Sequence, residues 1–181
     1  MHYLFLAEGF EEVEALTPLD LMRRAKIPVK TVGIGGRTVC GSHGIAVQAD
    51  LTDKEFNDLR PESVLLPGGM PGTLNLDASP VVQSAISAAL EADGHLFAIC
   101  AAPTILGRRG LLKGKRATCY PGMEKDLTGA ILTGERVVKD GNIITGAGMG
   151  VALDFGLAIV AELKGTETAE QLRRSVVAKP E

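Results

Sequence analysis

The 181-residue chain contains no tryptophan, and aromatic residues make up only 4% of it. Its core must therefore be built mainly from aliphatic side chains, and a hydrophobic content of 45% is sufficient for this. No apolar run approaches the roughly 20 residues that a transmembrane helix requires, so we expect no membrane span. Length and composition together predict a single domain over residues 1–181.

The chain also lacks a basic surplus. It has 19 Lys and Arg residues against 22 Asp and Glu residues, and its arginine pairs are scattered. Binding to nucleic acid depends largely on concentrated positive charge. We therefore expect no nucleic-acid partner.

Cysteine is scarce, and its spacing matches no metal-binding motif. The three cysteines are Cys40, Cys100 and Cys119. An odd number argues against a disulfide framework, so a reducing compartment, the cytoplasm, is expected. The sequence predicts neither a metal nor an organic cofactor.

Short apolar runs alternate with helical patterns along the chain. The predicted strands are 3–7, 29–34, 63–66, 96–99, 116–118, 137–139 and 143–145, with a small hairpin of 39–40 and 45–47. The predicted helices are 12–25, in which Pro18 would cause a local bend, 80–93, 102–109, 152–163 and a short one from Thr166. This alternation predicts a mostly parallel sheet with helices on both faces. Sites in such sheets form beyond the carboxyl ends of the strands, here the loops after residues 7, 66, 99 and 118.

An apolar strand stops at Cys100, and Ala101, Ala102 and Pro103 follow it. Small residues permit a sharp turn, and proline suits the first turn of a helix, as in the nucleophile elbow of other α/β enzymes. At a helix start the macrodipole would favour the thiolate, which is the reactive form of cysteine. The alternative is that Cys100 is a small buried hydrophobic residue.

Two further segments contain polar groups that would lie beside Cys100. In the glycine-rich loop 67–72, the Gly69 N–H would form an oxyanion hole with the Ala101 N–H, unless this is an ordinary tight loop. Glu14 follows two acids that suit a helix start, and its neighbours are apolar, so it should point inward. Desolvation there would leave the carboxyl protonated and able to donate a hydrogen bond to the sulfur.

Together these segments resemble the ThiJ/PfpI superfamily, on its DJ-1-like branch. The matching segments span nearly the whole chain and are 11–14, 18–25, 66–69, 98–103 and 154–159. The resemblance implies an α/β fold, a flavodoxin-like three-layer sandwich that forms a homodimer. It also implies Cys100 as nucleophile and Glu14 as a protonated glutamate beside the sulfur, with Gly69 and Ala101 as the oxyanion-hole donors.

The branch follows from single residues. PfpI-type proteases place histidine directly after the cysteine, where this chain has Ala101. Class I glutamine amidotransferases need a late His-x-Glu, whereas the last histidine here is His95. Tyr120 replaces a histidine of some DJ-1-like proteins; it is a poor base but can donate a hydrogen bond to a substrate, and a Cys–His dyad is in doubt. His43 lies in a turn whose family counterpart borders the neighbouring subunit's cleft, so both residues are substrate-pocket candidates, although His43 also fits a plain surface position.

The resemblance implies two functions between which the sequence does not decide. One is glutathione-independent glyoxalase or deglycase-type chemistry, in which the Cys100 thiolate attacks a 2-oxoaldehyde. The other is an oxidative-stress sensor or protective protein in which an oxidant converts Cys100 to a sulfinate. A binding module in which Cys100 is incidental is a third interpretation.

Overall fold

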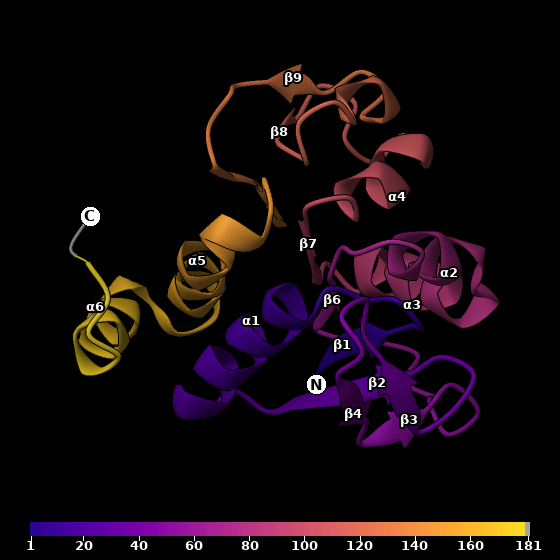
Figure 1. Ribbon diagram of the computed structural model, residues 1–181. Helices are drawn as coiled ribbons and strands as arrows, with labels where there is room; N and C mark the ends of the chain where they lie inside the picture. Colours follow the sequence, from indigo (N-terminus) through magenta and orange to yellow (C-terminus); the bar gives the residue numbers. More distant parts are fainter. Residues whose placement is uncertain (180–181) are drawn as a thin grey trace.

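The computed structural model describes residues 1–179 and is built on one seven-stranded sheet (Figure 1). The strand order is β10-β11-β7-β6-β1-β2-β5, and every neighbouring pair is parallel except β10 with β11. The strands are β1 (His2–Leu6), β2 (Val29–Gly33), β5 (Leu51–Thr52), β6 (Ser63–Leu66), β7 (His95–Ile99), β10 (Val137–Asp140) and β11 (Ile143–Gly146). The predicted, mostly parallel sheet is therefore confirmed.

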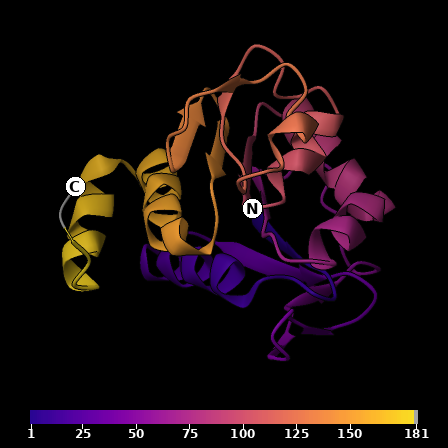
Figure 2. The same ribbon diagram turned by 45° about the horizontal axis from the view of Figure 1, so that its top comes forward.

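Helices cover both faces of this sheet (Figures 1 and 2). One face carries α1 (Glu12–Arg24) and α5 (Ala152–Lys164), with α6 (Thr166–Ser175) packed on α5. The opposite face carries α2 (Gly72–Ala78), α3 (Pro80–Glu91) and α4 (Pro103–Arg108). This is the three-layer α/β sandwich that the sequence predicts.

The alternation of side chains along the central strand explains the two cores. Leu4 and Leu6 of β1 join the core under α1 and α5, whereas Tyr3 and Phe5 join the core under α3 and α4. Successive residues of a strand point to opposite faces, so a strand that is apolar throughout fills both cores. The first strand is fully buried for this reason.

The two long helices on the first face approach closely at Gly156. A Cβ atom at this position would lie 2.6 Å from Leu21 Cδ1 and 3.0 Å from Pro18 Cα, so only glycine allows the observed packing. Pro18 itself is buried within α1, which runs without interruption from Glu12 to Arg24. This packing fixes the position of the first turn of α1, which carries Glu14.

Several short elements differ from the sequence-based prediction. The hairpin of β3 (Thr38–Cys40) and β4 (Ala46–Gln48) is confirmed, but β8 (Arg116–Ala117) pairs with β9 (Ile131–Leu132) in a small sheet apart from the main one. The elements α2, β5 and β9 were not predicted, nor were the 3-10 helices η1 (Glu124–Asp126) and η2 (Met149–Val151). Each is too short to show a hydrophobic period.

Within residues 1–179, no helix has the length and apolar character needed to cross a membrane.

Candidate active site

Cys100 lies directly after β7 with a φ of +65°, in the left-handed region that few non-glycine residues adopt. Its N–H donates to the Gly146 carbonyl (2.8 Å), and its carbonyl accepts from the Tyr120 N–H (2.8 Å). These two backbone bonds hold the residue in a conformation that costs free energy. The sharp strand-to-helix turn predicted around Cys100 is therefore present, and α4 begins three residues later at Pro103.

Glu14 reaches this turn from the first turn of α1. The Glu11 side chain caps the helix by accepting the Glu14 N–H (2.7 Å). The Glu14 side chain is only 1% exposed, and its carboxyl group is hydrogen-bonded to Cys100. One carboxyl oxygen also accepts the Gly68 N–H (3.0 Å). The inward orientation expected for Glu14 is what the structure shows.

Gly68 is the residue that allows the sulfur and the carboxyl group to meet. A Cβ atom at Gly68 would lie 2.5 Å from a Glu14 carboxyl oxygen and 2.7 Å from Cys100 Cβ. Both contacts are shorter than real Cβ atoms make, so any other side chain would push the two groups apart. The requirement for glycine here is steric, because a neighbouring residue rather than a special φ imposes it.

Two backbone N–H groups face the sulfur, those of Gly69 and Ala101. These are the two donors that the sequence predicts, and they come from the loop after β6 and the turn after β7. Their position lets them donate to a sulfur anion or to an oxygen bonded beside it. The site is thus assembled where the carboxyl ends of β1, β6 and β7 lie side by side.

The protonation of the pair differs from the sequence-based prediction. Burial, followed by the charge and hydrogen bond of Glu14, raises the pKa of Cys100 to about 12, although the N–H groups of Ala101 and Gly69 act to lower it. Burial also raises the pKa of Glu14 to about 7, against the lowering effect of its hydrogen bonds. The expected lowering of the thiol pKa by a helix dipole is therefore wrong in direction beside an ionised Glu14.

The two groups titrate as one unit, because the charge of each acts on the other. Protonation of Glu14 removes the repulsion that opposes a thiolate and creates a donor toward the sulfur. The raised pKa of Glu14 places this change near neutral pH. The structure therefore supports a Cys100 thiol beside a carboxyl group that gains and loses its proton near neutral pH.

Tyr120 adjoins this pair through its backbone. Its N–H is bonded to the Cys100 carbonyl, and its ring lies 3.5 Å from the point where a Cβ of Gly148 would be. The ring is about half exposed. Tyr120 therefore adjoins Cys100 through its backbone, and its role in a substrate pocket stays a prediction.

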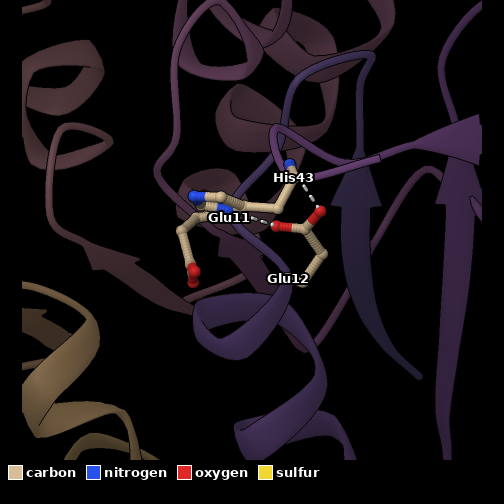
Figure 3. A group of neighbouring side chains, drawn as sticks. All are labelled: Glu11, Glu12 and His43. Atoms are coloured by element: carbon tan, nitrogen blue, oxygen red, sulfur yellow. Dashed lines mark hydrogen bonds and ion pairs between the residues drawn. The ribbon is translucent and has the colours of Figure 1, made fainter. Parts of the chain in front are cut away.

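His43 is bound to a different carboxylate (Figure 3). Its Nδ1 lies 2.9 Å from Glu12 Oε2, and its backbone N–H donates to Glu12 Oε1 (2.8 Å). Burial alone would raise the pKa of Glu12, but these bonds and the Ile45 N–H outweigh it and lower the pKa to about 2. His43 is exposed and is not brought to Cys100 of its own chain. Its role at a neighbouring subunit's cleft stays a prediction.

Glu11, Glu12 and His43 also have ligand atoms within 4.8 Å of one another. Each carboxylate is already occupied, however, because Glu11 caps α1 and Glu12 binds the turn at 42–45. A cation would have to displace the imidazole from Glu12. The group is better described as a clamp that ties β3–β4 to α1.

The other two cysteines are separate from Cys100. Cys119 is buried in the core under α3 and α4, whereas Cys100 packs against the core on the opposite face of the sheet. Burial raises the pKa of Cys119 to about 11, which leaves it a thiol. Cys40 is half-buried in β3, and all three are free.

Sequence reasoning missed the loop after β11. The Gly146 carbonyl accepts a hydrogen bond from the Cys100 N–H, and the Met149 N–H donates one to the Glu14 carboxyl group. The signal was available, because the glycine-rich run 146–150 directly follows a predicted strand. A fourth strand end thus contributes to the site.

Comparison with known proteins agrees with the fold. The model of the DJ-1/PfpI family matches residues 2–162. The chain belongs to the DJ-1/PfpI family. Within it, the chain is similar to DJ-1 homologues over nearly its full length: it is 36% identical to the Parkinson disease protein 7 homolog of Danio rerio, covering 97% of this chain and 96% of that protein.

Two further relatives extend the comparison of this DJ-1/PfpI chain. A solved structure of a cysteine-to-alanine mutant of a DJ-1 superfamily protein from Salmonella typhimurium has a TM-score of 0.93 and 34% identity, covering 99% of this chain and 98% of that one. The glutathione-independent glyoxalase DJR-1.2 of Caenorhabditis elegans is 29% identical, covering 91% of this chain and 89% of that protein. The relatives therefore favour the DJ-1 branch over the protease branch.

Proposed function

We propose that this protein is a cysteine-dependent enzyme that converts 2-oxoaldehydes to 2-hydroxy acids without glutathione. One observation carries the proposal: the Cys100 sulfur contacts a buried carboxyl group with a pKa near neutrality and two backbone N–H donors. This set supplies a nucleophile, a proton carrier and an oxyanion site. The similarity to a glutathione-independent glyoxalase supports the same chemistry.

The reaction balances without a redox partner. The sulfur of Cys100 adds to the aldehyde carbon while Glu14 accepts the thiol proton. Glu14 then returns this proton to the resulting oxyanion, held by the Gly69 and Ala101 N–H groups, which gives a hemithioacetal and regenerates the Glu14 carboxylate. The Glu14 carboxylate then moves the proton from the former aldehyde carbon to the neighbouring carbonyl carbon. The hydroxyl proton of the hemithioacetal passes to the neighbouring carbonyl oxygen, which becomes the hydroxyl group of the product. The product of this step is a thioester, and water cleaves it to release the 2-hydroxy acid and the thiol. Tyr120 would donate a hydrogen bond to a substrate oxygen.

The test is lactate formation from methylglyoxal. We expect Cys100→Ser to lose nearly all turnover, whereas Cys40→Ser, which removes a half-buried thiol in β3, keeps it. Equal rates for the wild type and Cys100→Ser would refute the proposal. Tyr120→Phe tests the added hydrogen bond, with an expected loss of about tenfold in kcat/KM.

A second function is favoured by the same donors. A sulfinate on Cys100 would accept hydrogen bonds from protonated Glu14 and from the Gly69 and Ala101 N–H groups. These bonds would stabilise the sulfinate against further oxidation to a sulfonate. Two equivalents of peroxide supply the two oxygens and leave as water. Mild peroxide followed by peptide mass analysis should place both oxygens on Cys100, and an even distribution over Cys40, Cys100 and Cys119 would exclude a sensor role.

We also propose that the chain works as a homodimer in a reducing compartment, the cytoplasm. A groove of about 440 Å³ runs along α1 and is lined by exposed apolar side chains, among them Val13, Ile45 and Leu153. A second copy would cover them, and a reducing compartment would keep the three free cysteines as thiols. Light scattering should give twice the chain mass, and Val13→Asp should lower it toward that of a monomer.

A further inference from the structure

Three residues with large side chains adjoin the Cys100 site through their backbones, on three different loops. Met70 follows β6, Tyr120 follows β8 and Met149 begins η2 after β11. Their exposed fractions are 49%, 52% and 53%, although each belongs to a residue next to, or in, a backbone contact of the site. Large apolar side chains left this exposed beside a reactive group often mark a binding surface.

Backbone hydrogen bonds fix the main-chain positions from which these side chains project, relative to the reacting groups. The N–H of Gly69, which faces the sulfur, immediately precedes Met70. The Tyr120 N–H donates a hydrogen bond to the Cys100 carbonyl, and the Met149 N–H donates one to the Glu14 carboxyl group. None of the three can move far without changing the geometry of the elbow or of the carboxyl group.

The side chains also differ from a polar or cationic rim. The ring of Tyr120 packs against Gly148, which directly precedes Met149, so Tyr120 and Met149 are close neighbours. The charges that act most strongly on Cys100 and Glu14 are those of Glu14 and Glu11, both acidic. Thioether and aromatic surfaces adapt to apolar groups of several shapes.

We propose that Met70, Tyr120 and Met149 form an apolar rim that selects 2-oxoaldehydes carrying an uncharged aryl or alkyl substituent over glyoxal. This inference rests on the proposed function, because it concerns the substrate of the same site. The aldehyde carbon reaches Cys100, and the substituent lies against the rim. Specificity thus comes from contacts of the part of the substrate that does not react.

The first experiment compares kcat/KM for phenylglyoxal and glyoxal. The ratio of the two values cancels the general effect of a substitution on the chemistry. In Met70→Ala and in Met149→Ala we expect this ratio to fall about fivefold, as for a loss of roughly 40 Å² of apolar contact. Leu59→Ala, which truncates a leucine that is 83% exposed and lies elsewhere, should leave the ratio unchanged. A ratio that stays constant in both methionine variants would overturn the proposal.

The second experiment needs no turnover and separates this inference from the proposed function. Cys100 is alkylated with iodoacetamide and with N-benzyl iodoacetamide, and the labelled peptide is quantified by mass. A benzyl preference that falls in Met70→Ala and Met149→Ala supports the rim even if no aldehyde is converted, in which case only the proposed function fails. A slower benzyl reagent whose rate rises in these variants would show that the side chains block access, and would overturn the rim as a binding surface.

Discussion

Glu12 and Glu14 are two buried glutamates in the same turn of α1, and their environments give them opposite properties. Glu12 is 3% exposed and Glu14 is 1% exposed. The pKa of Glu12 is lowered to about 2, whereas that of Glu14 is raised to about 7. A low exposed fraction alone therefore does not decide ionisation: burial acts to raise both pKa values, but the hydrogen bonds of Glu12 together outweigh it and those of Glu14 do not.

The difference lies in the donors that each carboxyl group meets. Glu12 accepts hydrogen bonds from the turn at 42–45 and from an imidazole, all of which favour its charged form. Glu14 meets a thiol and fewer N–H groups, and the Glu11 carboxylate lies close to it. A buried acid surrounded by donors is structural, and one with few donors can carry a proton near neutral pH.

The largest expected effect is a difference in catalytic activity between variants of the two residues. Glu14→Gln keeps the shape of the side chain but cannot accept the thiol proton, so turnover of methylglyoxal should fall by about 100- to 10 000-fold. Glu12→Gln, at a similarly low exposed fraction in the same turn, should stay within a few-fold of the wild type. Lactate assays of both variants check this, and comparable losses in the two would remove the distinction between them.

The next effect concerns pH and stability. The pKa of Glu14 is near 4.5 in the unfolded chain and about 7 in the folded chain, so the folded state holds a proton that the unfolded state loses between these values. Glu14 therefore stabilises the fold fully below about pH 4.5, and this contribution, about 3 kcal/mol, is lost as the pH rises through 7. Urea unfolding from pH 4.5 to 8 should show this decline in the wild type and not in Glu14→Gln; parallel curves for the two would contradict it.

The smallest effect concerns Glu12, whose folded-state pKa is lowered. Its contribution to stability is present above about pH 4.5 and is lost as the pH falls toward 2, opposite in sign to that of Glu14. At pH 7, Glu12→Gln should lower the free energy of unfolding by about 1–2 kcal/mol, because the N–H groups lose their charged acceptor and their hydrogen bonds weaken. Faster amide exchange at His43 and Ile45 would accompany it. The exposed Glu91→Gln serves as control and should change stability by less than about 0.5 kcal/mol.

The sequence predicts well those parts of the site that depend on local pattern. The strand that ends at Cys100, the small residues after it and the glycine-rich loop at 67–72 are all visible along the chain, and the structure brings the Gly69 N–H to the sulfur. The inward direction of Glu14 follows from its apolar neighbours. In each case a short segment contains most of the information that determines its own conformation.

The rest depends on contacts between distant segments. Glu12 and His43 are 31 residues apart in the sequence, and no local sequence pattern predicts the hydrogen bond between them. The raised pKa of Cys100 follows from burial and from Glu14, which lies in another element, so the helix-start argument alone gives the wrong direction. Likewise, β8 is a short strand by its sequence, but only the fold pairs it with β9 instead of adding it to the main sheet.

The backbone of Cys100 is anchored on both sides, by Gly146 and by Tyr120. A molecule attached to the sulfur therefore cannot gain room by displacing the main chain and must fit the fixed direction of the Cα–Cβ bond. Covalent probes for this protein should accordingly be selected for the angle between warhead and scaffold before their size is optimised.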